Sequence, residues 1–343
     1  MNPRVPTVSY LGWHGKGNIG DDAIYDAVRS QLPGARFLDL PRFPHERIRA
    51  AATGLNKSLR HSTHILGGGT LVGRRHWRGL ASHAAALTKK QGSFAIGVGV
   101  EDPVFKGRRS GSGNNELKRW APVLADFNII SVRGPRSAEL LGDVGIDAQV
   151  TGDPALLLPR PDVAVQDGLI GVNLGFGDDL WGHDPDYLAE TTSQSVKVLA
   201  SKGYRFRGIL MNASDARWTE RVLADVTAEI VAPADAAAAS REFAACSAVI
   251  VSRLHAGILA ALTGTPAISL EYQPKCRDFA LSIDDERSLI RTDQVVAHDI
   301  VDRVLAALSD SAAIRKRTCT AVEKLQRRLH DDYATVRQSV GLV

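Results

Sequence analysis

The segment SRLH (residues 252–255) places an arginine and a histidine two positions apart, between two strongly apolar runs. Arg253 can hold a carboxylate or phosphate through two parallel N–H groups, and His255 titrates near neutral pH. The flanking runs predict a buried strand at 248–252 and a helix at 255–262. Because a helix start offers unpaired backbone N–H groups, Leu254 included, the turn predicts an anion-binding and proton-transfer site. A histidine that only caps or packs is the structural alternative.

Two further cations follow the ends of predicted strands. Arg133 comes directly after the apolar run 128–132, and Lys275 closes the segment EYQPK (271–275) after the run 266–270. In a parallel sheet, ligands bind outside the carboxyl ends of the strands, so both side chains can reach the same gap as Arg253. The three cations together favour a small anionic substrate.

A glycine-rich loop follows the first apolar run. Residues 15–20 have the spacing GxGxxG, and Asp39 follows 19 residues later, as in dinucleotide-binding loops. However, Asp21 and Asp22 lie at the predicted helix start, where they would repel a diphosphate. We therefore expect no dinucleotide; Asn18 and Asp21 can instead hold sugar hydroxyls. The alternative is a tight turn in which Asp21 caps the helix.

The third apolar run ends in GGGTL (67–71), where successive glycines would let the backbone approach a ligand. The N–H groups of Gly68 and Gly69 are candidate donors, and a bare tight turn is the alternative. A basic run follows at once (Arg74, Arg75, His76 and Arg78) and is most simply a solvated surface.

Short strand-like runs alternate with amphipathic helical windows along the whole chain, which predicts the α/β class with parallel sheets. Strands are expected at 7–12, 35–38, 64–66, 93–98, 128–132 and 148–150, then at 169–174, 204–210, 229–231, 248–252 and 266–270. Helices are expected at 21–32, 45–58, 77–90, 116–126, 135–141, 186–202, 215–225, 236–244, 255–262, 295–308 and 312–340. A proline-rich break at 158–168 divides the chain into two Rossmann-like domains, 1–160 and 161–343, facing a central cleft. Whether the last helix returns to the first domain is left open.

Composition excludes several classes of protein. The chain has 343 residues, of which 44% are hydrophobic, so disorder is excluded as its main state. No apolar run reaches the ~18–20 residues of a membrane span, and the N-terminus shows no secretory pattern, so a cytoplasmic protein is expected. Three cysteines without a CxxC pair predict neither a disulfide framework nor a structural zinc site. The net charge of +4 does not require nucleic acid.

Six segments, in order, resemble the polysaccharide pyruvyl transferase family. They are GNIGDDAI (17–24), GGGTL (67–71), SVRGPRSAELL (131–141), GDPALLL (152–158), SRLHAGILAALTGTPAISL (252–270) and EYQPK (271–275). The resemblance implies a fold similar to the two-domain GT-B glycosyltransferases. It also implies transfer of pyruvate from phosphoenolpyruvate onto two hydroxyls of a sugar, which gives a cyclic ketal. The family's donor-binding and catalytic positions correspond here to Arg133, Arg253 and His255.

These observations lead to a mechanistic hypothesis. His255 is the candidate general acid, and Asp21 is the candidate base or ligand of an acceptor hydroxyl. The substrate-binding candidates are Arg133, Arg253, Leu254, Lys275, Asn18, Gly68 and Gly69. Phosphoenolpyruvate is the donor substrate, no other cofactor is expected, and no His/Asp cluster has the spacing of a metal site. The acceptor would be a glycan, a glycolipid or a lipid-linked saccharide of the cell envelope.

Two rival functions stay open: a GT-B glycosyltransferase that uses a nucleotide sugar, and a non-catalytic carbohydrate- or anion-binding protein. Sugar-stacking candidates are Trp13, Trp77, Trp181 and Trp218. With a lipid-linked acceptor, a basic surface would contact an anionic membrane at its inner face; its candidates are Arg74, Arg75, Arg78, Arg108 and Arg109. The oligomeric state is left open.

Overall fold

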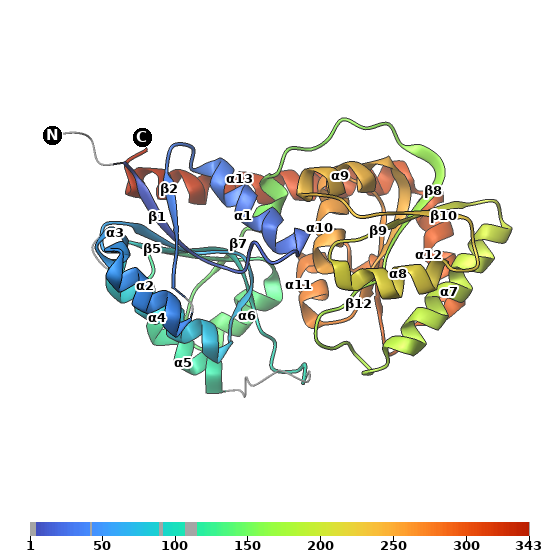
Figure 1. Cartoon of the computed structure of the whole chain (residues 1–343). Helices are drawn as coiled ribbons and strands as arrows, with labels where there is room; N and C mark the ends of the chain where they lie inside the picture. The colour runs from blue at the N-terminus through green and yellow to red at the C-terminus, as the bar shows by residue number, and fades with distance from the viewer. Residues whose placement is uncertain (1–4, 42, 89–91, 107–114, 343) are drawn as a thin grey trace.

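The computed structural model of the chain describes residues 5–41, 43–88, 92–106 and 115–342. Two lobes lie side by side, each built on one parallel sheet with helices on both faces (Figure 1). Parallel strands need crossover connections, and the amphipathic windows between the strand-like runs supply them as helices. The alternation in the sequence is thus the direct cause of this layered arrangement.

The first lobe contains seven strands in the order β2-β1-β3-β5-β6-β7, with β4 pairing to β5. The strands are β1 (Thr7–Leu11), β2 (Arg36–Asp39), β3 (Thr63–Leu66), β4 (Gly69–Val72), β5 (Ser93–Val100), β6 (Ile129–Val132) and β7 (Gln149–Val150). The helices are α1 (Ile19–Gln31), α2 (Pro44–Ala52), α3 (Leu55–Leu59), α4 (Arg75–Thr88), α5 (Asn115–Leu124) and α6 (Pro135–Gly142), and the 3-10 turn η1 (Pro154–Leu157) follows.

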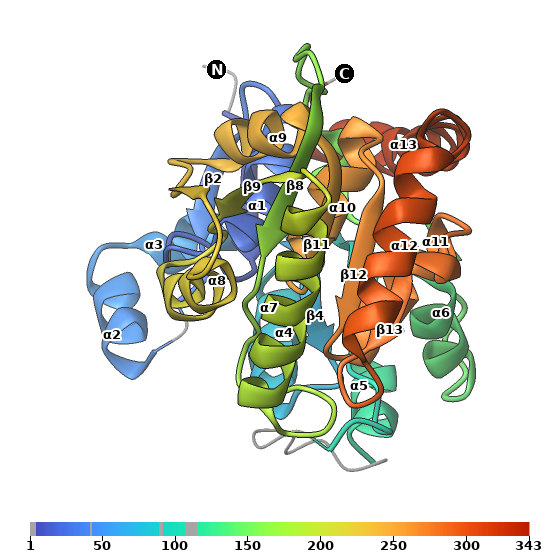
Figure 2. The same ribbon diagram turned by 90° about the vertical axis from the view of Figure 1, so that its right-hand side faces the viewer.

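The second lobe contains six strands in the order β10-β9-β8-β11-β12-β13. They are β8 (Gln166–Asn173), β9 (Arg205–Ile209), β10 (Ala228–Val231), β11 (Cys246–Val251), β12 (Ala267–Glu271) and β13 (Leu289–Arg291). The helices are α7 (Pro185–Ser201), α8 (Ala216–Leu223), α9 (Ala236–Ala245), α10 (Leu254–Thr263), α11 (Pro274–Ser282), α12 (Ala297–Ser309) and α13 (Ser311–Val340), with short 3-10 turns η2 (Ala213–Asp215) and η3 (Glu286–Ser288). Figure 2 shows α7 and α12 in front of this sheet and α9 and α10 behind it.

The last helix, α13, joins the two lobes. It begins beside the second sheet and runs along the top of the first lobe, so that the two chain ends lie near each other (Figure 1). Its Asp332 accepts a hydrogen bond from Ser131 of β6 at 2.6 Å, and Arg328 donates to the carbonyl of Val150 at 2.7 Å. The question that the sequence left open is answered: the helix returns to the first lobe. The predicted domain boundary at residue 160 lies in the segment between β7 and β8.

A continuous apolar core connects the lobes on the side of α1 and α13. It contains buried side chains of β1 and α1, such as Val8 and Ile24, together with Ile250 of β11 and Leu329 of α13. A second apolar cluster lies on the opposite face of the first sheet, under α4 and α5. One apolar core therefore joins the two lobes.

One predicted helix is wrong, and three elements were not predicted. The single helix expected at 45–58 is two helices, because Gly54 adopts a left-handed φ of 73° between α2 and α3. The glycine-rich segment 67–71, expected to be a loop, contains the short strand β4, paired to β5. The helix α11 and the strand β13 were not expected, and α11 begins at Pro274, which is favourable at a first helical position.

Candidate active site

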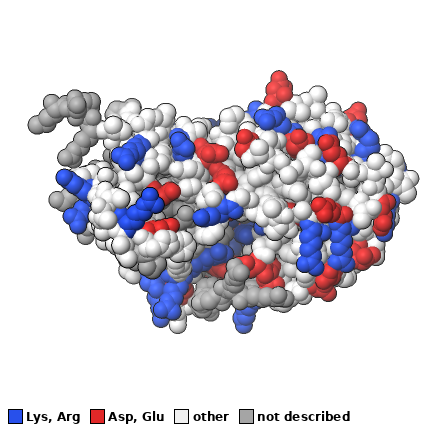
Figure 3. Space-filling model, viewed as in Figure 1, with Lys and Arg blue, Asp and Glu red and all other residues white. Residues whose placement is uncertain are grey.

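A cavity of about 420 Å³ lies between the two lobes. Figure 3 shows basic side chains in the hollow between the lobes. The first lobe contributes Trp13, Asn18, Asp21, Gly69, Thr70, Leu71, Arg74, His76, Trp77 and Arg133. The second contributes Gly177, Asp178, Met211, Arg253, Leu254, His255, Tyr272, Gln273 and Lys275. Every sequence-predicted site residue except Gly68 therefore lines one cavity.

The glycine-rich loop positions Asn18 and Asp21 at the start of α1. Asn18 is the residue that caps the helix, because its side chain accepts a hydrogen bond from the N–H of Gly20 at 3.1 Å. The alternative in which Asp21 caps the helix is thus wrong; its carboxylate accepts a hydrogen bond from the Asn18 side chain instead. The loop is also tied to the other lobe, since the N–H of Ile19 donates to the carbonyl of Met211 at 3.0 Å.

Asp21 is held among opposite charges. Burial raises the pKa of its carboxyl above the ordinary value, and the charges of His255 and Lys275 act in the opposite direction. A carboxyl group with a raised pKa holds its proton more readily than an exposed one, which suits proton exchange with a substrate hydroxyl.

Arg253 follows β11 and precedes the first residue of α10. Its Nε and Nη2 both donate to Oδ1 of the fully buried Asp215, at 2.9 and 2.6 Å. Nη2 also donates to the hydroxyl of Ser214 at 3.1 Å. The guanidinium is therefore fixed in the cavity wall by η2, with its side chain 13% exposed.

His255 lies in the first turn of α10 and packs across the gap against Gly20. A Cβ atom at residue 20 would lie 2.3 Å from Nδ1 of the ring. On the other side, Nε2 lies 3.7 Å from Oδ2 of Asp153 and has no hydrogen-bond partner in the described part of the chain. The ring is thus confined between the two lobes.

Arg133 follows β6 and is completely buried. The sequence predicted an open guanidinium reaching into the cleft; instead its Nε donates to Oδ2 of Asp153 at 3.0 Å. Its two terminal nitrogens, Nη1 and Nη2, find no hydrogen-bond partner among the described residues. Burying a cation whose N–H groups have no acceptor costs free energy, unless an anion accepts hydrogen bonds from them. The terminal edge of the Arg133 guanidinium, with Nη1 and Nη2, is therefore suited to bind a ligand oxygen.

The remaining predicted binding residues differ in their surroundings. Lys275 lies in the first turn of α11, with Nζ 4.8 Å from the centre of the Tyr272 ring. Gly69, with φ of 92°, lines the cavity. Gly68 does not, because it packs against Ile24, where an added Cβ would lie 2.9 Å from Cγ2.

The four tryptophan candidates fall into two groups. Trp13 and Trp77 line the cavity and meet edge to face, with ring centres 6.3 Å apart. Trp13 is 41% exposed, whereas Trp77 is buried beneath it. Trp181 and Trp218 are absent from the cavity lining, since they pack against Phe105 and Phe176. Only the first pair can contact a ligand of this site.

Comparison with known families shows the family to which the chain belongs. The family model described as polysaccharide pyruvyl transferase matches residues 18–274, which contain every charged residue of the cavity except Lys275. The chain belongs to the polysaccharide pyruvyl transferase family. No curated protein gives a significant sequence match.

Solved structures show which fold this pyruvyl transferase family member has. UGT89C1 of Arabidopsis thaliana, complexed with UDP, has a TM-score of 0.56 at 13% identity, covering 98% of this chain and 99% of its own. The UDP-GlcNAc 2-epimerase of Neisseria meningitidis, bound to UDP-GlcNAc, has a TM-score of 0.54 at 11% identity, with 94% and 99% covered. The UDP-GlcNAc 2-epimerase of Methanocaldococcus jannaschii has a TM-score of 0.56 at 11% identity, covering 87% of this chain and 91% of its own. These are GT-B proteins, so the predicted GT-B-like fold is confirmed.

The basic run after β4 is largely paired within this pyruvyl transferase family member. Arg74 binds Glu101 at 2.5 Å and Arg78 binds Glu116 at 2.6 Å, which reduces the free positive charge of that surface. Arg108 and Arg109 lie outside the described residues. In the described ranges, no helix has both the length and the apolar character of a membrane span. The same ranges contain no group of three or more His, Cys, Asp or Glu side chains arranged for a metal ion.

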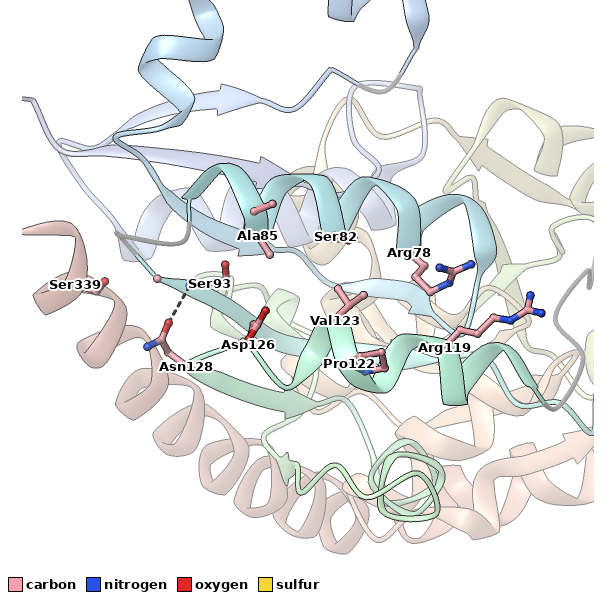
Figure 4. Close-up of a pocket in the computed structure, with 12 residues that line it drawn as sticks. Arg78, Ser82, Ala85, Ser93, Arg119, Pro122, Val123, Asp126, Asn128 and Ser339 are labelled. Carbon is pink, nitrogen blue, oxygen red and sulfur yellow. Dashed lines mark hydrogen bonds between the residues drawn. The ribbon is translucent and has the colours of Figure 1, made fainter.

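A second, larger cavity of about 790 Å³ lies in the first lobe, between α4, α5 and the end of α13 (Figure 4). Its two arginines, Arg78 and Arg119, both lie near Glu116, at 2.6 and 3.7 Å. None of its described lining side chains holds an unpaired buried polar atom. Of these two cavities, only the one between the lobes has unpaired buried donors among its described lining residues, so that cavity is the candidate active site.

Sequence reasoning missed two carboxylates of the site. Asp153 lies within the segment GDPALLL, where an aspartate before a proline at a helical turn was the available signal. Asp215 gave no comparable signal, because its partner Arg253 is 38 residues away in the chain. Both are fully buried, and both hold an arginine of the cavity.

Proposed function

We propose that this protein transfers a pyruvyl group from phosphoenolpyruvate to two hydroxyls of one sugar, forming a cyclic ketal. The observation that carries the proposal is the set of unpaired buried donors: two terminal nitrogens of Arg133 and Nε2 of His255. Both side chains lie within hydrogen-bonding or ion-pair range of one carboxylate, at the floor of a cavity that Arg253 and Lys275 also line. An anionic oxygen bound there would accept hydrogen bonds from the two terminal nitrogens of Arg133, while Nε2 of His255 faces Asp153.

The donor would bind through its two anionic groups. Phosphoenolpyruvate carries a carboxylate and a phosphate, and planar guanidinium groups match both. Arg133 and Arg253 approach from opposite lobes, and Lys275 adds a third positive charge. The N–H groups at the start of α10, including that of Leu254, favour the same anion.

The reaction would proceed by proton transfer to carbon. His255 gives a proton to the methylene carbon of the donor, which makes the second carbon electrophilic. A sugar hydroxyl adds to that carbon, and its proton passes to Asp21. The bond from carbon to the phosphate oxygen then breaks, phosphate leaves, and the neighbouring hydroxyl closes the ketal with loss of its proton to phosphate. Atoms balance as one ketal and one inorganic phosphate.

The acceptor would lie on the first lobe. Trp13 offers an exposed indole face at the cavity, and Asn18 and Asp21 offer polar groups for sugar hydroxyls. The acceptor class is a glycan, glycolipid or lipid-linked saccharide. With a lipid-linked acceptor, the reaction would occur in the cytoplasm at the inner face of the membrane.

The test is incubation with phosphoenolpyruvate and a panel of glycans, followed by assays for phosphate and for a product heavier by one pyruvate ketal. Replacement of His255 by Ala should lower turnover by ~10²–10⁴-fold, because one positioned acid contributes about that much. Circular dichroism checks that the fold is kept. Near-normal turnover of the variant would remove the catalytic role of His255.

A nucleotide-sugar donor is the second candidate, since two structural neighbours are described as bound to UDP or UDP-GlcNAc. Thermal unfolding separates the two. At 100 times its dissociation constant, the true donor stabilises the protein by about 2.7 kcal/mol. Stabilisation by UDP-GlcNAc, with none by phosphoenolpyruvate, would replace the proposal.

A further inference from the structure

Asp153 lies beneath the cavity with no solvent exposure. Its Oδ1 accepts a hydrogen bond from the N–H of Ala155 at 3.0 Å, because Asp153 is the capping residue of η1. One oxygen of the carboxylate is therefore fixed by the backbone. The other, Oδ2, is directed to side chains.

Oδ2 faces two side chains from different lobes. It accepts from Nε of Arg133 of β6 at 3.0 Å, and it lies 3.7 Å from Nε2 of His255 of α10. Tyr10 of β1 and Tyr333 of α13 are the other titratable groups that face it. Burial raises the pKa of Asp153, but His255 and Arg133 outweigh burial, and the pKa lies below its ordinary value. The group is thus a carboxylate that favours positive charge on its neighbours.

The opposite side of the imidazole is closed by Gly20. Three atoms of His255, namely Nδ1, Cγ and Cβ, lie close to the backbone of Gly20. A Cβ atom added at residue 20 would be within 2.6 Å of each of them. A flip of the ring would turn a carbon atom toward Asp153 and give up the ion pair. Asp21 and Lys275 are the further charged groups around this histidine. Among these groups, the Asp153 carboxylate is the one that Nε2 faces.

We propose that Asp153 is the positioning residue of this site: it holds the His255 ring with its proton on Nε2 and, through the same oxygen, turns the terminal edge of Arg133 to the donor. The state of the ring is a property of the free protein. The consequence for turnover rests on the proposed function.

The first test needs no substrate. ¹⁵N NMR of the histidine rings in the wild-type protein should show the neutral His255 ring carrying its proton on Nε2; the His255→Gln variant assigns the signal. In Asp153→Asn, the midpoint of His255 protonation should move to lower pH, because the carboxylate that favours the charged ring is gone. A neutral ring protonated on Nδ1, or an unmoved midpoint, would overturn the proposal.

The second test separates positioning from stability. In Asp153→Asn, turnover should fall mainly on the alkaline side of the pH profile and recover toward the wild-type rate on the acidic side. A loss equal at every pH would mean a structural role only. Asp332→Asn is the matched control, since Asp332 is also a nearly buried carboxylate but binds Ser131. If neither protein transfers pyruvate while the NMR midpoint still moves, the proposed function fails and this inference stands.

Discussion

The imidazole of His255 and the backbone of Gly20 are in direct contact across the gap between the lobes. Because no side chain other than hydrogen fits at residue 20, the third glycine of the GxGxxG loop leaves room for an imidazole ring from the other lobe. Its backbone is helical and needs no left-handed conformation, unlike Gly15 and Gly17, which have φ of 66° and 73°. The same spacing that resembles a dinucleotide loop thus has another physical reason here.

Gly20→Ala should displace the His255 ring and lower turnover by at least tenfold, while the affinity for phosphoenolpyruvate changes less. The cost is steric, since alanine is otherwise the better helix former by about 1 kcal/mol. Steady-state kinetics measure the turnover and the affinity of the variant, and circular dichroism checks its fold. Gly79→Ala is the control: residue 79 lies in α4 with open space for a Cβ, so this variant should keep full activity and gain stability. Unchanged turnover in Gly20→Ala would show that the contact is not required.

Arg253→Ala should destabilise the fold as well as weaken donor binding. It leaves the carboxylate of Asp215, which has no solvent exposure, without its cation, at a cost of about 3–5 kcal/mol. Arg253→Lys keeps the positive charge but loses the paired hydrogen bonds of the guanidinium. It should therefore be more stable than Arg253→Ala and still bind phosphoenolpyruvate weakly. Denaturant unfolding and calorimetric titration measure the two effects. The control Arg221→Ala breaks an exposed pair with Asp186 and should cost under about 1 kcal/mol. An Arg253→Ala protein as stable as the control contradicts the assignment.

Trp13→Ala should raise the KM for the saccharide acceptor roughly tenfold and leave the KM for phosphoenolpyruvate unchanged. The indole is the exposed member of the pair with Trp77, so its removal takes away a stacking surface without opening the core. Trp13→Phe should restore most of the affinity. Trp218→Phe, outside the cavity, is the control. Equal changes in both KM values would mean that Trp13 shapes the whole cavity rather than an acceptor subsite.

The helices and strands with a regular hydrophobic pattern could be predicted from the sequence. The strand ends that are followed by a basic residue could be predicted as well. Arg133 and Arg253 follow β6 and β11, as the apolar runs indicate. What could not be predicted is what each arginine binds. Asp153 and Asp215 are 20 and 38 residues away from their partners. Such pairs form only when the loops of a whole lobe pack against one another. The local hydrophobic pattern of the sequence does not predict that packing.

The same limit applies to contacts between the lobes. Gly134 precedes α6 at the capping position but has no side chain to cap it, and the cap comes from Asp278 of α11 in the other lobe. Oδ1 of Asp278 accepts from the N–H of Ser137 at 3.0 Å, and Oδ2 accepts from its hydroxyl at 2.6 Å. A Cβ at residue 134 would lie 2.0 Å from the carbonyl oxygen of Asp278. The glycine after Arg133 therefore serves the junction of the lobes.

This junction predicts a pH dependence of stability. Burial raises the pKa of the Asp278 carboxyl, although the bonds from Ser137 and the charge of Arg133 oppose it. Between about pH 4, where the unfolded chain loses this proton, and the raised pKa, the folded protein binds more protons than the unfolded one. Its contribution to stability is therefore complete at low pH and is lost as the pH rises through the raised pKa. Asp278→Asn keeps an acceptor for the Ser137 N–H but cannot ionise.

Thermal unfolding from pH 4 to 8 should therefore show the Asp278→Asn variant gaining on the wild type as the pH rises. Asp278→Ala lacks the cap at every pH, so it should be less stable than Asp278→Asn by about 1 kcal/mol throughout. Parallel curves for wild type and Asp278→Asn would contradict a titrating carboxylate at the junction. Equal stability of the Ala and Asn variants would contradict the capping of α6 by the opposite lobe.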